Sequence, residues 1–450
     1  MKLPSRHKLI PFSNVMLERN GRRNKDSFII CVILCILAFG LMSLQLNIIQ
    51  TARNVIYPSF SSMMQRPYPY HSMAFTQSQW SRRPETTHID CKRMFENDTE
   101  YIKRRILPAV NEDVGFPVAH VKIVYMDYEL IEEQLANTYA AENIYCFAID
   151  RESDYTFKWF MRQLSLCLPN VIIAKEERSI SRTGSNQNQA QIDCLKDMRP
   201  YKWNYAVMLQ NHDIIIKTHA EMSKIMKALN GSNDVAGAEC PIGRCKSMER
   251  NMGKLGLCPN NLKADQANAC KASNITYVKG GMQILLSRKA SEYVLDHLDL
   301  SKFLAIQGKL GMGVDEQLWQ TLHFNDILRL PGGGTTQCMN GSSQSVTRLV
   351  YWSYGPKQPC LSNLRRHAIC MMGVEYLPTL AKTKELMANK MMPDFDYAAI
   401  SCVGELLRNR SRGIVKSQLN MEKYEKLNMV RYNRERVQKN FDKTKFKCVV

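Results

Sequence analysis

One uncharged, strongly apolar segment near the N-terminus limits the compartment in which most of this chain can fold. Phe28–Leu44 contains no charged side chain, and the apolar stretch extends to Ile49. That length reaches the lower end of what spans a hydrocarbon core. A cleaved signal peptide is the alternative, but the region before the segment is long and Gln45–Asn47 is a poor cleavage site.

The basic residues of the N-terminus precede this segment, so the positive-inside rule leaves residues 1–27 in the cytosol. We therefore expect a single-pass type II membrane protein with an anchor at 28–49 and a lumenal remainder. Fifteen cysteines occur, thirteen of them after the anchor, where an oxidising lumen would pair most of them. Five N-x-S/T sequons also follow the anchor and are candidate glycosylation sites: Asn97, Asn230, Asn274, Asn340 and Asn409.

The net charge of +19 in 450 residues would suggest a nucleic-acid partner if it lay in the folded part of the chain. It does not, because residues 1–26 hold +5 and residues 405–450 hold +8, while residues 91–404 hold only +4. A nearly neutral domain does not present the basic surface that tracks phosphates, so we expect no nucleic-acid partner.

The pattern after the anchor changes from irregular to periodic. Residues 50–90 contain scattered Pro and Ser and are interpreted as a stem, whereas apolar runs of strand length alternate with amphipathic stretches from Cys91 onward. The expected strands are Val118–Tyr125, Asn143–Ile149, Asn170–Ala174, Tyr205–Leu209 and Met282–Leu286. The expected helices are Leu130–Ala141, Tyr155–Leu168, Asn188–Met198 and Ala220–Leu229. This alternation predicts an α/β sandwich around a mainly parallel sheet, spanning residues 91–408.

Two segments interrupt or follow this pattern. Residues 231–275 are rich in Gly, Asn and Lys and contain four cysteines without a C-x₂-C pair, which favours two local disulfides over a zinc knuckle. Residues 409–450 are charged, with few apolar positions, and are interpreted as a solvated tail.

Six short motifs occur in one order over about 310 residues. They are Tyr101–Arg105, Asn143–Asp150, Asp213–Thr218, Asp315–Trp319, Trp352–Tyr354, and Ala388–Lys390 followed by Cys402. In this order they resemble the core 2 / I-branching β-1,6-N-acetylglucosaminyltransferase family, glycosyltransferase family 14. The resemblance implies a GT-A-like domain that transfers a sugar from a UDP-sugar with inversion.

The motif at Asp315–Trp319 supplies the candidate base. Asp315 and Glu316 open an amphipathic stretch, where negative charge also stabilises a helix N-terminus without any catalysis. The resemblance implies that Glu316 is the general base that takes the proton of the acceptor hydroxyl. Asp315 is assigned a supporting role only.

The leaving diphosphate needs positive charge beside it. Asp394-Phe395-Asp396 matches the D-x-D motif of metal-dependent transferases, but its place near the end of the domain favours helix or turn charge. The resemblance implies instead a metal-independent clamp made of Lys390 and Arg366, with Arg365 as the alternative arginine. No cofactor is expected.

Further residues are assigned to the two substrates through the same resemblance. Asp150 would bond the ribose, although it could equally cap a loop, and Ile123 and Tyr125 would line the uracil pocket, although Ile123 could simply pack in the core. Trp352 and Tyr354 would contact the acceptor sugar through their faces, with ordinary core or edge packing as the alternative.

The chain departs from the family pattern on the acceptor side. The family's Leu-Cys-Gly-x-Asp-x-Pro string reads Leu209–Ile215 here, without the Cys, Gly and Pro. The acidic residue that grips the acceptor falls near Ala236, and Glu239 is the substitute we consider. The acceptor therefore does not follow from the resemblance.

The resemblance also implies three disulfides, each worth about 2–4 kcal/mol. They join Cys91 to Cys167, Cys146 to Cys194, and Cys360 to Cys370. Cys402 matches a cysteine whose family partner lies in the stem, and this stem has none. Cys402 is therefore free or paired with Cys338 or with a cysteine of 231–275.

These observations predict a Golgi enzyme that moves a sugar, GlcNAc in the first instance, from a UDP donor to a hydroxyl of an O-glycan or glycoprotein. A peptide xylosyltransferase-like enzyme is one alternative. A non-catalytic membrane-anchored protein that binds glycan or UDP is the other. Donor sugar, linkage and a homodimer through the anchor stay open.

Overall fold

The computed structural model describes residues 114–449 except 246, 308–312, 340–343 and 354–358. Several predictions lie outside these residues, namely the anchor, the stem, Cys91, Asn97, Asn340 and Tyr354. Within the described residues, no helix has the length and apolarity needed to cross a membrane.

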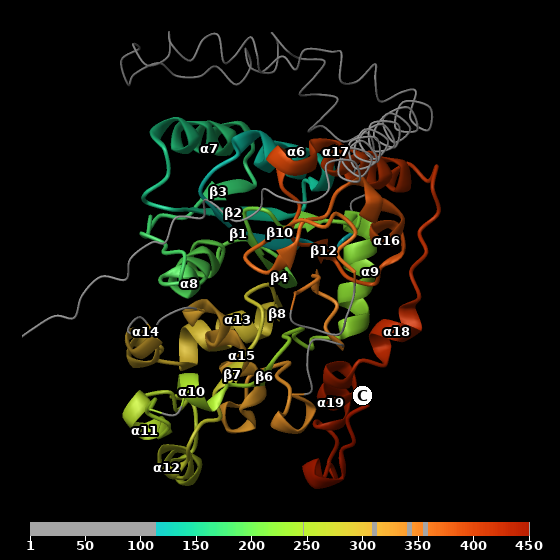
Figure 1. Cartoon of the computed structure of the whole chain (residues 1–450). Helices are drawn as coiled ribbons and strands as arrows, with labels where there is room; N and C mark the ends of the chain where they lie inside the picture. Colours follow the sequence, from blue (N-terminus) through green and yellow to red (C-terminus); the bar gives the residue numbers. More distant parts are fainter. Residues whose placement is uncertain (1–113, 246, 308–312, 340–343, 354–358, 450) are drawn as a thin grey trace, which may run out of the picture. The chain divides into compact units, whose positions relative to one another are not determined.

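A five-stranded sheet in the order β3-β2-β1-β4-β8 forms the centre of the domain (Figure 1). Its members are β1 (Val118–Val124), β2 (Ile144–Ile149), β3 (Val171–Ile173), β4 (Tyr205–Gln210) and β8 (Leu285–Ser287). The first four are mutually parallel, and β8 is antiparallel to β4. The strand order reverses between β1 and β4, which is where open α/β sheets bind ligands beyond their carboxyl ends.

Helices cover both faces of this sheet (Figure 1), which confirms the α/β prediction. Because side chains alternate along a strand, Ala119, Val121 and Ile123 of β1 pack toward α8 (Gln187–Asp197), while Val118 packs toward α9 (His219–Leu229). The bounds of α6 (Tyr128–Thr138), α7 (Tyr155–Cys167), α8 and α9 fall within a few residues of the predicted helices.

A second, three-stranded sheet in the order β5-β12-β9 continues from the end of β4. It contains β5 (Ile214–Ile215), β12 (Met387–Ala388) and β9 (Arg348–Leu349). Beside it lie the hairpin β10 (Arg365–Arg366) and β11 (Ile369–Cys370), then α16 (Leu377–Lys382) and α17 (Pro393–Ser411). Ile214, Cys370 and Val403 belong to one buried cluster, so these segments share a core.

The cysteine-rich segment folds as a small unit closed by two local disulfides, as expected. Cys240 pairs with Cys245, and Cys258 pairs with Cys270. Its helices are α10 (Ile242–Cys245), α11 (Met252–Leu255) and α12 (Ala264–Ala272), and its ribbon is β6 (Ala238–Glu239) with β7 (Val278–Lys279). The chain continues through α13 (Arg288–His297), α14 (Ser301–Gln307), the 3₁₀ turn η1 (Val314–Glu316) and α15 (Leu318–Phe324).

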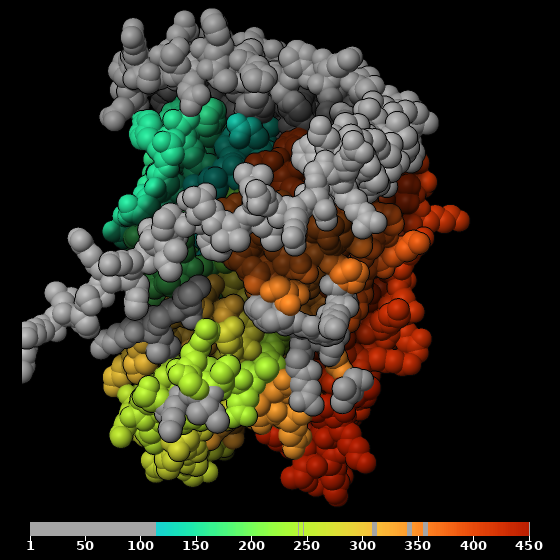
Figure 2. Space-filling model, viewed as in Figure 1, coloured from blue at the N-terminus to red at the C-terminus, as the bar shows by residue number. Residues whose placement is uncertain are grey.

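The C-terminal segment is not a solvated tail, so that interpretation is wrong. Helices α18 (Met421–Glu425) and α19 (Asn428–Glu435) bury Tyr424 and Val430 against the α9 side of the core. A disulfide joins Cys448 to Cys338, and Figure 2 shows the red C-terminal segment against the orange part of the chain. A few well-placed apolar side chains are sufficient to hold this segment against the core, although the segment as a whole is charged.

Candidate active site

The predicted donor-side residues lie at the carboxyl edge of the main sheet. Tyr125 follows β1, Asp150 follows β2, and Asn211 follows β4. The Asn211 side-chain oxygen accepts hydrogen bonds from the amides of Tyr125 (2.9 Å) and Met126 (3.3 Å). This pair of bonds joins the ends of β1 and β4 at the point where the strand order reverses.

The structure distinguishes the three donor-side predictions. Tyr125 is 41% exposed. Burial raises the pKa of its hydroxyl, and the charges of Arg366 and Arg182 act in the opposite direction. Asp150 caps the following loop through Oδ1, which accepts a hydrogen bond from the Glu152 amide (3.1 Å) and another from the more distant Ile180 amide (3.1 Å). Ile123 is 4% exposed within the main core, so the structure assigns it to packing and does not support its expected contact with uracil.

A β-hairpin with a two-residue turn contains Arg366, the arginine predicted for the clamp. Arg366 pairs with Ile369 across β10 and β11, and the turn between them consists of His367 (φ 50°) and Ala368 (φ 64°). Positive φ at both positions is the type I′ geometry that matches the twist of a hairpin. Arg366 is the arginine whose charge acts on Tyr125, whereas Arg365 acts on Tyr376 on the other side. The register therefore favours Arg366 over Arg365.

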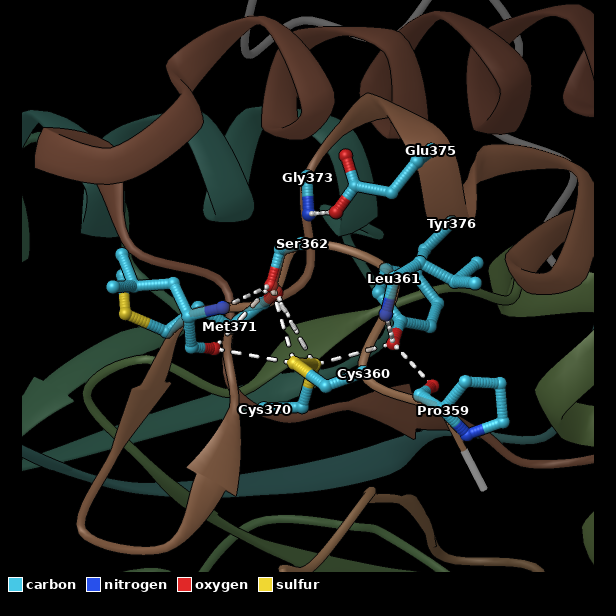
Figure 3. Close-up of a disulfide and its surroundings, with 10 residues drawn as sticks. Pro359, Cys360, Leu361, Ser362, Cys370, Met371, Gly373, Glu375 and Tyr376 are labelled. Atoms are coloured by element: carbon cyan, nitrogen blue, oxygen red, sulfur yellow. Dashed lines mark hydrogen bonds between the residues drawn. A yellow bond between two sulfur atoms is a disulfide. The ribbon is translucent and has the colours of Figure 1, made fainter. Parts of the chain in front are cut away.

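A disulfide holds the base of this hairpin (Figure 3). Cys360 bonds to Cys370, the last residue of β11, as the family resemblance implied. The Tyr376 hydroxyl lies 3.2 Å from Cys370 Sγ and accepts a hydrogen bond from the Leu361 amide (2.9 Å). The predicted bridge between Cys146 and Cys194, which joins β2 to α8, is also present.

A buried carboxylate anchors the residue that precedes Lys390, the second predicted clamp residue. Asp213 is fully buried and accepts hydrogen bonds from Asn389 Nδ2 (2.7 Å), Gln283 Nε2 (2.9 Å) and the Gln210 amide (2.6 Å). Lys390 follows Asn389 directly. Its pKa is lowered by burial and by Arg366, while Asp213 acts in the opposite direction. The charge of Arg366 thus acts on Lys390 as well as on Tyr125.

The candidate base lies in a short turn and not in an α-helix. Asp315 and Glu316 belong to η1, which precedes the wholly buried α15. The Glu316 carboxylate is partly exposed and pairs with Lys279 Nζ (2.5 Å) and with Arg244 Nη1 (3.8 Å). Burial, together with Glu316, raises the pKa of Asp315 to about 7.

Arg348 connects the two halves of the site, and the sequence analysis missed it. Its guanidinium lies over the Trp352 ring, 5.8 Å from the centroid, and it lowers the pKa of both Asp315 and Lys390. A Cβ on Gly281 would lie 3.1 Å from its Nη2, so the guanidinium packs closely against this glycine. The one available signal was an arginine four residues before the aromatic motif.

The other predicted residues fall outside this cluster. Asp396 accepts hydrogen bonds from the amides of Val374 (3.0 Å) and Ala399 (3.1 Å), so it serves the turn at the start of α17, as the preferred interpretation held. Glu239 is exposed and pairs with Val278, so it projects from the face of the ribbon opposite to Lys279. Asn230 and Asn274 are exposed sequons, whereas Asn409 is partly buried within α17.

A mainly parallel sheet with cations near its carboxyl edge can bind an anionic ligand such as a nucleotide there. The family model described as Core-2/I-Branching enzyme matches residues 118–381, and the chain belongs to this family. The chain is therefore a glycosyltransferase, with a nucleotide-sugar donor and a glycan acceptor.

Several relatives named for an enzymatic activity are similar to this chain over most of its length. One is a β-1,3-galactosyl-O-glycosyl-glycoprotein β-1,6-N-acetylglucosaminyltransferase of Bos taurus, 26% identical over 74% of this chain and 80% of the relative. The enzyme of that name numbered 3 from Homo sapiens is 29% identical over 72% of this chain and 74% of the relative. An enzyme of the same name from Bovine herpesvirus 4 (strain LVR140) is 29% identical over 72% and 73%.

Proposed function

We propose that this protein transfers N-acetylglucosamine from UDP-N-acetylglucosamine to a hydroxyl of an O-glycan, forming a β-1,6 branch. Support comes from the relatives, which are named for this transfer, and from Arg348, whose charge acts both on Asp315, the neighbour of Glu316, and on Lys390. This shared action of Arg348 is the observation on which the proposal depends, because it supports a base and a diphosphate clamp in one site.

The proposed reaction is a direct displacement with inversion. Glu316 takes the proton of the acceptor hydroxyl while that oxygen bonds to the anomeric carbon of the donor. The bond between the anomeric carbon and the diphosphate oxygen breaks, and UDP leaves with the electron pair. A carboxylate in this position must be ionised and able to reach the hydroxyl, and Glu316 is partly exposed.

Arg366 and Lys390 stabilise the leaving UDP in this proposal. Charge-assisted hydrogen bonds from two cations do the electrostatic work that a divalent metal does in other transferases, so we propose a metal-independent reaction. Lys390 is partly buried, and this burial lowers its pKa. Partial burial suits the proposed role, because a cation that is partly shielded from water interacts more strongly with a phosphate than an exposed cation does.

We further propose that the enzyme is a Golgi protein anchored by residues 28–49 with its domain in the lumen. The apolar segment and its basic flank support this topology. The five disulfides between described cysteines support an oxidising compartment.

The test is UDP release by residues 50–450 in EDTA, with a panel of UDP-sugars and O-glycan acceptors. We expect turnover with UDP-N-acetylglucosamine and a loss of about 10²–10⁴-fold in Glu316→Gln. Glu422→Gln is the matched control, since Glu422 is largely exposed and pairs only with Lys426 among the described residues. Turnover that requires manganese would refute the clamp and return attention to Asp394 and Asp396. UDP binding without turnover would favour a non-catalytic protein.

A further inference from the structure

The carboxylate that the proposed reaction needs as a base is held by two cations. Lys279 Nζ lies 2.5 Å from Glu316 Oε2, and Arg244 Nη1 lies 3.8 Å from the same oxygen. Lys279 ends β7, and Arg244 belongs to α10, so two separate elements converge on one oxygen atom. Both side chains are partly exposed, at 28% and 36%, and can therefore meet a ligand.

Arg244 is placed there by the cysteine-rich segment that distinguishes this chain. The disulfide between Cys240 and Cys245 closes the short loop that contains Arg244. Its Nη1 atom is buried, yet it has no hydrogen-bond partner among the described residues. A Cβ on Gly313 would lie 2.5 Å from Glu316 Oε2 and 3.0 Å from Arg244 Nη1, so the chain packs closely around the pair.

The two cations have a consequence for the reaction. When Glu316 accepts a proton, its charge is lost, and Lys279 and Arg244 are left facing each other without an anion. Two uncompensated cations oppose proton uptake by the base. Glu239 does not replace the lost charge, because it projects from the other face of the ribbon, and Asp315 is buried away from a ligand that enters from solvent.

We propose that Lys279 and Arg244 bind an anionic substituent on the acceptor glycan, either a carboxylate of an acidic sugar or a sulfate or phosphate ester. This inference rests on the proposed function, whose base it concerns. The anion takes the place of the Glu316 carboxylate on the two cations, and Glu316 becomes free to accept the hydroxyl proton. The donor diphosphate keeps its own partners, Arg366 and Lys390.

The atoms balance without a further reactant. The acceptor hydroxyl loses its proton to Glu316 and forms the new bond to the anomeric carbon, while UDP departs with the electrons of the broken bond. The anionic substituent changes no bond and only exchanges ion pairs. By drawing Lys279 away from Glu316, the bound anion raises the proton affinity of the Glu316 carboxylate. The anion therefore affects both the rate of the reaction and the affinity for the acceptor.

The experiment measures UDP release by the full chain in detergent micelles. The acceptors are a neutral O-glycan core disaccharide, the same disaccharide with an acidic sugar, and the same disaccharide with a sulfate ester. We expect kcat/KM at least about 10-fold higher for one of the charged acceptors, as one charge-assisted contact provides. Whichever charged acceptor is preferred identifies the source of the anion.

Lys279→Met and Arg244→Met should each abolish that preference and leave the KM for the donor unchanged. Lys254→Met is the matched control, since Lys254 lies in the same segment but pairs with Glu249. The Lys254→Met variant should keep the preference for the charged acceptor. Because Lys279→Met and Arg244→Met are tested independently, a folding defect in one of them does not decide the result.

Three outcomes would overturn the inference. They are equal rates with neutral and charged acceptors in the wild type, a preference that survives both substitutions, and a donor KM that rises in Lys279→Met. If no acceptor turns over, the proposed function fails separately. Direct titration of the charged and neutral glycans then decides the inference, because equal affinities for the two, or binding that Lys279→Met leaves unchanged, would refute it.

Discussion

Asp315 offers a test of the site that does not depend on knowing the substrate. Its side chain is buried, and a Cβ on Gly184 would lie 2.0 Å from its Oδ1, so the packing around it leaves no room for a hydration shell. Burial and the neighbouring Glu316 raise its pKa from 3.8 to about 7. The folded protein therefore holds a proton on Asp315 over a pH range in which the unfolded chain has released it.

The sign of the effect on stability follows from this difference. Between about pH 4 and 7 the folded state binds more protons than the unfolded state, so the free energy of unfolding falls as the pH rises. A shift of about three pKa units corresponds to at most about 4 kcal/mol. The contribution of Asp315 is thus most favourable below pH 4 and is lost by the time the pH exceeds 7.

Asp315→Asn removes this dependence with almost no change of shape. We expect the variant to match the wild type near pH 4 and to exceed it by about 2–4 kcal/mol at pH 8. Urea unfolding of residues 50–450 at several pH values measures the difference. Asp299→Asn is the control, because hydrogen bonds from Ser301 lower the pKa of Asp299, so its effect on stability changes only below about pH 4. A stability difference for Asp315→Asn that does not change between pH 4 and 8 would refute the reasoning.

Two further predictions concern the diphosphate clamp. Asp213→Asn removes the buried charge that positions the clamp lysine, so we expect a KM for the donor raised about 10-fold or more and an altered pH profile, measured by UDP release. Replacing Cys360 and Cys370 together by Ser should cost about 2–3 kcal/mol of stability and also weaken UDP binding, because the hairpin loses its closure. Replacing Cys258 and Cys270 instead opens a loop of similar length away from the clamp. That control should lose stability but keep UDP affinity, and equal losses of affinity would contradict the positioning role of the hairpin.

The sequence by itself was sufficient to predict the main sheet and the helices that cover it. Each strand from β1 to β4 is a short, apolar run, and each helix from α6 to α9 has one apolar face, so both patterns are local. The exception was the expected strand Met282–Leu286, which is shorter and shifted to Leu285–Ser287. Its antiparallel pairing depends on where the preceding segment returns, which periodicity does not specify.

The C-terminal segment shows where composition misleads. Its charge predicted a solvated tail, yet Tyr424, Leu427 and Val430 pack against the core, and Cys448 reaches Cys338. In a helix of two or three turns, a few residues at the right spacing are enough to bury one face. An average over forty residues hides those positions, and nothing local identifies a disulfide partner that lies 110 residues away.

In the active site, too, local motifs identified some residues, and the tertiary structure was needed for the relations between them. The motifs, read through the family resemblance, were enough to nominate Glu316 and Lys390, because each belongs to a short string. Only the tertiary structure decided that the charge of Arg366 acts on Tyr125, that Arg348 acts on both Asp315 and Lys390, and that Lys279 pairs with Glu316. These relations depend on hairpin register and on contacts between residues far apart in the chain, whereas periodicity and motifs report on neighbours a few residues away.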